Sequence, residues 1–274
     1  KLAIRFMDNA IDVNNYPIPR AKEEALRTRK LGLGIMGFAD MLIQMGIPYN
    51  SPQALKLAEI IMETVQQTAH LASQELAEER GVFPAFKGSI YDRESGKPMR
   101  NATCTTIAPT GTLSLIAGVS GGIEPSFAMV FVRNILGGEQ MPEVNPYFEK
   151  IAKKEKFYSE ELLKRMVSNN RLQGIDSVPD NIKEIFVTAH HITSEDHIKM
   201  QAAFQKYVHN AVSKTMNFPK SASKEDMAKV FIMAHKERLK GITVYRDDSM
   251  ELQPLSTGEM GLEMVCEYAC RQDK

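Results

Sequence analysis

The sequence predicts an α/β fold that is helix-rich, has parallel strands and ends in a flexible C-terminal tail. Short β-prone segments alternate along the chain with helical segments of about ten residues or more. Parallel neighbours need a crossover of this size, so the alternation favours a parallel sheet. With 274 residues, 43% of them hydrophobic, the chain can bury an ordinary globular core.

Two helices are clear in the first part of the chain. Apolar residues keep helical spacing over residues 2–13, until an Asn-Asn-Tyr-Pro sequence stops the pattern. The longest predicted helix covers residues 52–80, with Ser51 as N-cap, a proline at its first position and Gly81 just past its end. We expect one face of this helix to pack on the core along its whole length.

Between these helices, residues 31–45 are apolar and contain the glycines of the sequence GLGIMG. A dinucleotide-binding fingerprint has similar spacing, but it follows a strand and precedes an acidic residue by about 20 positions. Here the preceding residues 20–30 are charged and helical. Close helix packing is therefore the better interpretation of the glycines, and cofactor binding is the alternative.

The remaining elements follow the same alternation. Residues 102–107 are Thr-rich and β-prone and predict a buried strand, after which a turn opens into a short helix. Beyond them we predict strands at 127–135, 213–218 and 242–246, and helices within 146–170, at 180–186, from Ser194 through Val212 and at 225–239. Residues 1–247 then form one α/β unit, and the acidic, glycine-containing residues 248–274 form the flexible tail.

Charge and cysteine content exclude several classes of protein. Lys plus Arg and Asp plus Glu each number 34, so the basic excess typical of nucleic-acid binding is missing. The longest apolar runs are far shorter than the roughly 20 residues of a membrane helix. Three cysteines, an odd number, favour a reducing compartment over a disulfide framework. We expect a cytoplasmic protein with no nucleic-acid or membrane partner, whose first residue, Lys1, lies inside a longer chain.

The strongest chemical signal lies at residues 108–118, where a predicted strand ends in Pro-Thr-Gly-Thr and a helix begins. The first turn of a helix presents unpaired amides and the positive end of the helix dipole, and a glycine allows an anion to approach closely. Thr110, Thr112 and Ser114 add hydroxyl donors. An ordinary Thr-capped helix explains these residues equally well, so the local pattern leaves both interpretations open.

Other reactive side chains give weaker signals. The tail contains Cys266 and Cys270, whose thiols can close and exchange a disulfide when the tail bends; an incidental pair is the alternative. Cys104 lies in a predicted buried strand and is interpreted as a small core residue. The histidines of residues 190–197 lack a second ligand motif, so we predict no metal site.

Five segments resemble class II ribonucleotide reductase, the adenosylcobalamin-dependent branch of that family. They are FMDNAIDVNNYPIP, RKLGLGIMGFADMLIQMGIPY, NATCTTIAPTGTLSLIAGVSGGIEPSFA, AAFQKYVHNAVSKTMNFP and LKGITVYRD. Together they run in the family's order from about residue 4 to residue 247, so the match is far more specific than any single motif.

The resemblance implies a fold, an activity and a site. The family folds as a ten-stranded α/β barrel made of two five-stranded halves, and these segments are similar to the second half. Its members convert ribonucleotides to 2′-deoxyribonucleotides by radical chemistry with adenosylcobalamin, which supplies DNA precursors. By resemblance, the substrate's phosphates bind at Pro109, Thr110, Gly111, Thr112, Leu113 and Ser114.

The resemblance also implies partners. Cys266 and Cys270 are similar to the tail dithiol that re-reduces the family's active-site disulfide, which implies a thioredoxin-like reductant. The loop Asn-Pro-Cys-Gly-Glu, which carries the radical cysteine, is absent from this sequence. We therefore expect the missing N-terminal half as a partner, allow for a homodimer, and expect the isolated chain to be inactive. The alternatives are a non-catalytic nucleotide- or phosphate-binding subunit and a structural half of a split reductase.

Tyr245 lies on the strand where the diiron-dependent class of the family passes its radical through tyrosines, but its neighbourhood ITVYRD resembles the cobalamin class and lacks a paired tyrosine, so a relay role is not supported. Two residues depart from the family's pattern. Cys104 replaces a residue that is usually aliphatic in the family, and His191 replaces a frequent Asp.

Overall fold

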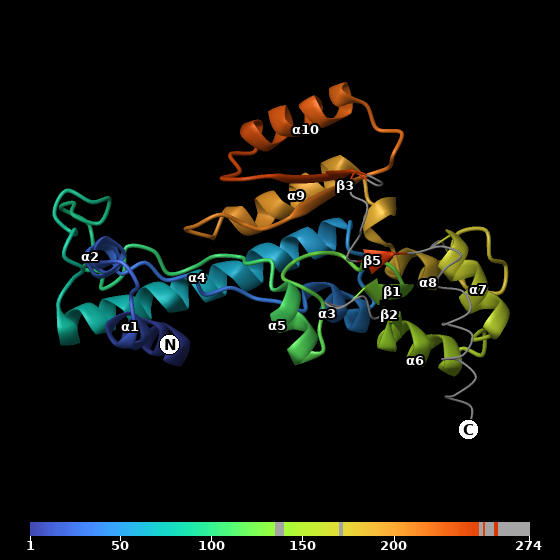
Figure 1. Cartoon of the computed structure of the whole chain (residues 1–274), viewed down its shortest axis with the longest axis horizontal. Coiled ribbons are helices and arrows are strands. Elements are labelled where there is room, and N and C mark those ends of the chain that lie inside the picture. Colours follow the sequence, from blue (N-terminus) through green and yellow to red (C-terminus); the bar gives the residue numbers. More distant parts are fainter. Residues whose placement is uncertain (135–139, 170–171, 247–248, 250–254, 257–274) are drawn as a thin grey trace.

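Helices make up about half of the computed structural model, which describes residues 1–134, 140–169, 172–246, 249 and 255–256 (Figure 1). The α-helices are α1 (Leu2–Val13), α2 (Pro19–Thr28), α3 (Phe38–Met45), α4 (Pro52–Arg80), α5 (Gly111–Ala117), α6 (Pro146–Lys154), α7 (Glu160–Asn169), α8 (Asp180–Ile185), α9 (Ser194–Gln205) and α10 (Lys224–Lys236). A short 3₁₀ helix covers Ala189–His191. The strands are β1 (Val130–Asn134), β2 (Gln140–Val144), β3 (Thr215–Phe218), β4 (Thr243–Arg246) and β5 (Leu255–Ser256).

Four extended segments lie side by side and run parallel. β3 pairs with β4, and residues 210–213, just before β3, pair with residues 105–107. Residues 103–106 pair on their other side with residues 31–33. The parallel arrangement predicted from the alternation of strands and helices is confirmed for these segments.

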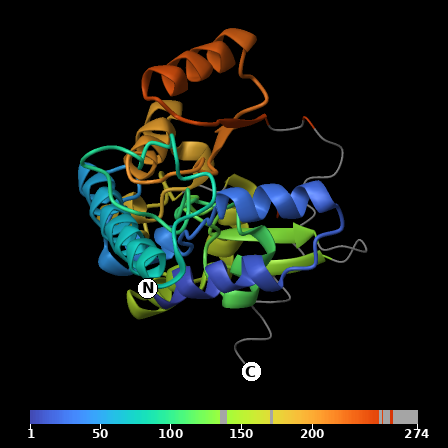
Figure 2. The same cartoon turned by 90° about the vertical axis from the view of Figure 1, so that its left-hand side faces the viewer.

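The long helix α4 forms as its sequence predicts. The Ser51 hydroxyl accepts a hydrogen bond from the Ala54 amide at 3.1 Å, and the Gly81 amide closes the other end on the Ala77 carbonyl. The helix packs against α9 and α1, and Figure 1 shows it spanning much of the molecule. In both views α10 lies above β3 and β4 at the top of the molecule (Figures 1 and 2).

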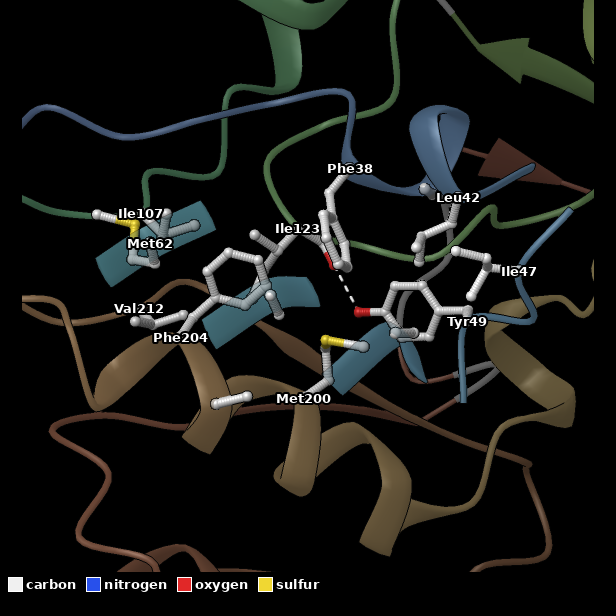
Figure 3. Close-up of a cluster of buried hydrophobic side chains, with 14 of the residues drawn as sticks. Phe38, Leu42, Ile47, Tyr49, Met62, Ile107, Ile123, Met200, Phe204 and Val212 are labelled. Atoms are coloured by element: carbon white, nitrogen blue, oxygen red, sulfur yellow. Dashed lines mark hydrogen bonds between the residues drawn. The ribbon is translucent and has the colours of Figure 1, made fainter. Parts of the chain in front are cut away.

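A cluster of buried apolar side chains lies between α3, α4 and α9 (Figure 3). The Phe38 ring meets the Phe204 ring edge-on with centroids 5.0 Å apart, and it meets Tyr49 at 6.2 Å. Both phenylalanines are almost fully buried, and each such side chain contributes roughly 1.5–3 kcal/mol of hydrophobic stabilisation. The cluster includes Ile107 and Ile123, which lie on either side of the Pro-Thr-Gly-Thr turn in the sequence.

Two of the three glycines of GLGIMG, Gly32 and Gly34, pack closely, but against an extended segment and not in the helix packing that the sequence predicted. Residues 31–33 are extended and pair with residues 103–106. A Cβ on Gly34 would lie 2.1 Å from the Thr106 carbonyl oxygen, and one on Gly32 would lie 2.6 Å from the Thr106 methyl. Only glycine therefore allows these two segments to approach so closely.

Two sequence predictions about regular structure were wrong. The strand predicted at 127–135 is β1, but it pairs antiparallel with β2 and β5. Only residues 135–139 separate β1 from β2, and a connection this short permits antiparallel pairing alone. The helix predicted to run through Val212 ends at Gln205, whose side-chain amide bonds to the Val208 and Asn210 carbonyls and so frees residues 210–213 for the sheet.

Most of the predicted tail, including Cys266 and Cys270, lies outside the described residues. Within it, Leu255 and Ser256 pair with β1 as β5, so this part of the tail is a strand rather than a flexible segment. None of the helices described in the structure is both long enough and apolar enough to span a membrane.

Candidate anion-binding site

The Pro-Thr-Gly-Thr turn follows directly from the extended residues 103–107. Residues 108–110 leave that segment at its C-terminal end, and α5 begins at Gly111. Ligands of α/β proteins generally bind beyond the carboxyl ends of parallel strands, so the turn has the position expected for a site. In α5, every residue except Ser114 is exposed.

The first turn of α5 presents free amides. Gly111, Thr112 and Leu113 are exposed, and their amides donate no hydrogen bond to any residue that the structure describes. The next amide, that of Ser114, bonds to the Thr110 carbonyl at 2.8 Å and begins the helical pattern. Nothing lies within 4 Å of a Cβ placed on Gly111, so no neighbouring atom crowds that side of the glycine.

Thr110 does not act as an ordinary N-cap. Its backbone is left-handed, with φ of 53°, and its side chain makes no capping bond to α5. The hydroxyl oxygen instead accepts a hydrogen bond from the Gly122 amide at 2.8 Å. The interpretation of this region as a simple Thr-capped helix is therefore wrong. Because the oxygen accepts from Gly122, the hydroxyl hydrogen remains available to a ligand.

The other predicted contact residues differ in how they are placed. Pro109 and Leu113 are exposed, and 55% of the Leu113 surface is accessible. Ser114 is buried, and its hydroxyl donates to the Gly111 carbonyl at 3.2 Å within the first turn of α5. The six predicted residues thus form one continuous segment that leads into α5, in which the Ser114 hydroxyl is engaged within the helix.

The segment that returns from α5 is held to α3. The buried Asp40 carboxylate accepts a hydrogen bond from the Ser120 amide at 2.6 Å, and the Gly37 amide donates to the Ser120 carbonyl at 2.7 Å. Burial raises the pKa of Asp40, and the bonds from Ser120 partly oppose this shift. The sequence analysis missed Asp40, although an acidic residue inside the apolar stretch 31–45 was a signal.

A second contact holds the same segment to the apolar cluster. The Tyr49 hydroxyl donates to the Ile123 carbonyl at 2.5 Å, the bond drawn as a dashed line in Figure 3. Burial raises the pKa of Tyr49 well above its ordinary value, so this hydroxyl keeps its proton. Ile123 is itself fully buried, which fixes the backbone immediately before Glu124.

An ion pair links this same segment to the sheet. The Nζ of Lys214 lies 2.6 Å from Oε2 of Glu124 and donates to the Thr215 carbonyl at 3.0 Å. Oε1 of Glu124 accepts from the Thr215 amide at 2.6 Å. The Lys214 side chain is fully buried, whereas 29% of the Glu124 side chain is accessible. The sequence analysis missed this pair because the two residues are distant in the chain.

Comparison with known proteins identifies the family. The family described as "Ribonucleotide reductase, barrel domain" matches residues 1–245. The chain belongs to this family.

Two curated ribonucleotide reductases and one solved structure show how much of such a protein the chain covers. It is 50% identical over 256 residues to a vitamin B12-dependent ribonucleoside-diphosphate reductase of Thermoplasma acidophilum, over 93% of this chain and 33% of that protein. It is 47% identical over 255 residues to the enzyme of the same description from Mycobacterium tuberculosis H37Rv, over 93% of this chain and 36% of that protein. The chain thus spans about a third of the length of these relatives.

The solved structure is the Actinobacillus ureae class Id ribonucleotide reductase alpha subunit. It superimposes with a TM-score of 0.75 and 28% sequence identity, and the match covers 89% of this chain and 44% of the subunit. The described fold is therefore that of the reductase family.

Cys104, His197 and the hydroxyl of Tyr245, which all lie outside the turn, are buried. Cys104 is fully buried, and burial raises its pKa to about 11, which confirms the interpretation as a core residue. His197 is buried and bonds through Nε2 to the Ala189 carbonyl at 3.0 Å. The Tyr245 hydroxyl on β4 is buried and has no hydrogen-bond partner among the residues described.

Proposed function

We propose that this chain supplies the substrate-phosphate-binding part of a ribonucleotide reductase that converts ribonucleotides to 2′-deoxyribonucleotides with adenosylcobalamin. The observation that carries the proposal is the exposed turn at Gly111, Thr112 and Leu113, whose three amides donate no hydrogen bond to any residue that the structure describes. The proposed reaction is taken from the family and from the names of its vitamin B12-dependent relatives.

The chemistry of the turn suits a polyphosphate. Amides at the start of a helix, together with its dipole, stabilise negative charge, and an uncapped helix start leaves those amides to the ligand. The Thr110 hydroxyl, held by the Gly122 amide, adds a donor whose position is fixed before the substrate binds. Because the relatives are named for ribonucleoside diphosphates, we propose a diphosphate as substrate.

We further propose that the parallel segments are half of a ten-stranded barrel. The segments at 31–33 and 243–246 lie at the two edges of the described parallel layer, and exposed edges are prone to pair with further strands. Strands from the N-terminal half of a reductase would cover them. That half would also bring the loop with the radical cysteine beside the phosphate site.

The cofactor is not assigned to residues of this chain. A cofactor site is expected to be mainly apolar with a few polar groups. The cavity of about 540 Å³ between α4 and α9 is lined instead by charged side chains, among them Glu59, Lys199, Lys206, Glu237 and Arg238, and does not fit a corrin.

The tail completes the proposal. Cys266 and Cys270 would carry electrons from a thioredoxin-like reductant to the active-site disulfide. The whole enzyme would be cytoplasmic, and a homodimer is compatible with this proposal. Their sequence spacing and the family resemblance support this role.

Calorimetric titration of the chain with a ribonucleoside diphosphate tests the phosphate site. We expect binding that competes with inorganic pyrophosphate and is weaker for the free nucleoside, because the turn contacts the phosphates. Equal affinity for nucleoside and nucleotide would contradict the proposal.

A further inference from the structure

Lys214 is a fully buried cation in a protein whose other described lysines are mostly at the surface. Its ammonium group contacts one carboxylate oxygen of Glu124 at 2.6 Å and the Thr215 carbonyl at 3.0 Å. Burial lowers the pKa of Lys214, and the Glu124 carboxylate opposes that shift. The ion pair therefore links the sheet to the segment that returns from α5.

A buried ion pair is a costly way to join two segments. Removing both charges from water costs several kcal/mol per ion, and apolar residues of the same volume are often as stable or more stable. What an ion pair adds is geometry, because each donor and acceptor has a defined direction. Here the Glu124 carboxylate accepts from both the Lys214 ammonium and the Thr215 amide, so its position is defined from two sides.

The position of Glu124 is transmitted to the phosphate turn over a short distance. Gly122 is two residues away, and its amide is the donor that holds the Thr110 hydroxyl at 2.8 Å. A Cβ on Gly122 would lie 2.9 Å from the Ala108 carbonyl oxygen, and one on Gly121 would lie 3.2 Å from the Pro109 carbonyl oxygen. The return segment thus lies directly against the residues that lead into the turn.

The sheet places Lys214 at the same level as the start of the turn. Val212 pairs with Ile107, and the Ser213 amide donates to the Ile107 carbonyl at 2.9 Å. Lys214 follows Ser213, and Ala108 follows Ile107. The exit of one strand, the return segment and the next strand therefore meet at the Lys214–Glu124 contact.

We infer that Lys214 and Glu124 are positioning residues for the phosphate-binding turn, acting through the Gly122 amide and the Thr110 hydroxyl. The inference rests on the proposed function of the turn. Neither side chain need touch the substrate. The pair holds Thr110 in its left-handed conformation with its hydroxyl hydrogen directed to the ligand, so that a nucleoside diphosphate meets a turn that is already ordered.

Two substitutions in the full chain test the inference. Lys214→Met removes the cation and keeps most of the side-chain volume. Glu124→Gln keeps the shape but replaces one carboxylate oxygen with an NH2 group, which cannot accept from the donor that this oxygen contacts. Asp8→Asn is the matched control, because it breaks another buried ion pair, between α1 and Arg29, that makes no contact with the turn.

Two measurements are made on each variant below its unfolding temperature: the Kd for a ribonucleoside diphosphate and the hydrogen-exchange rate of the Gly122 amide. We expect both Lys214→Met and Glu124→Gln to weaken binding about tenfold or more, which corresponds to about 1.4 kcal/mol, and to speed Gly122 exchange. Asp8→Asn should lower the unfolding temperature and leave both quantities unchanged.

The outcomes separate this inference from the proposed function. If the unmodified chain does not bind the nucleotide, the phosphate site fails, while Gly122 exchange still reports on positioning. If the unmodified chain binds, and neither variant changes the Kd or the exchange rate beyond the control, the pair is only structural and the inference is overturned. If Lys214→Met does not fold, Glu124→Gln decides by the same criteria.

Discussion

The imidazole rings of His70 and His209 meet edge to edge, with their Nε2 atoms 2.6 Å apart. Nδ1 of His209 accepts from the Cys104 amide at 3.3 Å and lies 3.0 Å from the Thr105 hydroxyl. A backbone amide can only donate, so Nδ1 of His209 carries no proton and its Nε2 does. Nε2 of His70 must then be the acceptor. The contact joins α4 to the sheet only while both rings are neutral.

This pair predicts acid sensitivity. Burial, the neighbouring His70 and Lys240 lower the pKa of His209 to about 4, and burial lowers the pKa of His70. The unfolded chain, with histidine pKa near 6.5, then binds protons that the folded chain does not. Stability is therefore complete above about pH 6.5 and falls as the pH is lowered toward 4.

Thermal unfolding between pH 7.5 and 4.5 measures this effect. The pH dependence of Tm should be shallower in His209→Gln than in the unmodified chain. His235→Gln serves as the control, since His235 is exposed on α10 and should leave the profile unchanged. His197, whose pKa burial and Lys214 lower to about 3, accounts for part of the slope that remains. An unchanged profile in His209→Gln would contradict the assignment.

Gly111→Ala separates ligand binding from folding. No atom lies within 4 Å of the added methyl group, and alanine is favoured over glycine in a helix by roughly 0.5–1 kcal/mol. We expect Tm to be unchanged or slightly higher. If an anion approaches the first turn of α5, the methyl group should weaken nucleotide binding about tenfold, a loss of about 1.4 kcal/mol in calorimetric titration. Unaltered affinity would place the phosphates elsewhere.

Gly34→Ala should destabilise the fold. The new methyl carbon would lie 2.1 Å from the Thr106 carbonyl oxygen, so the paired segments would have to separate. Overpacking of this kind costs about 1–3 kcal/mol, measurable by urea unfolding. Gly241→Ala is the comparison, because its methyl group would meet only Ala211 at 4.0 Å. Equal stability of the two variants would show that the packing at Gly34 is looser than described.

Asp8→Asn should lower the free energy of unfolding more than the same substitution at a surface aspartate does. Asp8 is fully buried, and its two oxygens accept from Arg29, Arg80, Arg100 and Asn101. Breaking one side of a buried ion pair costs about 3–5 kcal/mol, whereas the Asp180 side chain is almost fully exposed and its pair with Lys183 should contribute far less. Urea unfolding of Asp8→Asn and Asp180→Asn compares them. Similar losses would contradict the prediction.

The same network predicts a second acid transition. Burial alone would raise the pKa of Asp8, but the bonds from Arg29 and Asn101 and the nearby charges lower it overall. The folded chain therefore holds the carboxylate charged to lower pH than the unfolded chain does. Its contribution to stability is present above about pH 4 and is lost as the pH falls below that value. Asp8→Asn should remove this component from the pH dependence of Tm.

The isolated chain should form no 2′-deoxyribonucleotide with adenosylcobalamin and a dithiol. The sequence lacks the Asn-Pro-Cys-Gly-Glu loop that carries the radical cysteine in the family. Activity should appear when an N-terminal reductase fragment containing that loop is added, and it should require the Thr110–Gly111–Thr112 turn. Product formation by the chain alone, measured by chromatography of the nucleosides, would refute the prediction.

Local sequence was sufficient for features that depend on neighbouring residues. Ser51, Pro52 and Gly81 mark the ends of α4, and the Pro-Thr-Gly-Thr sequence marks a turn into a helix, because capping and glycine geometry act over a few residues. The segments that resemble the reductase family also predicted the family's fold, because their sequences and their order along the chain can be recognised without knowing which segments meet in space. The tail dithiol remains a prediction of this kind.

Only the tertiary structure decided which segments meet. Local periodicity does not say that residues 210–213 leave α9 to join the sheet, or that β1 pairs antiparallel with β2. The Lys214–Glu124 and His70–His209 contacts join residues far apart in the chain. Such contacts form because burial requires each polar group to find a partner, and that partner is set by the packing of the whole domain and not by adjacent residues.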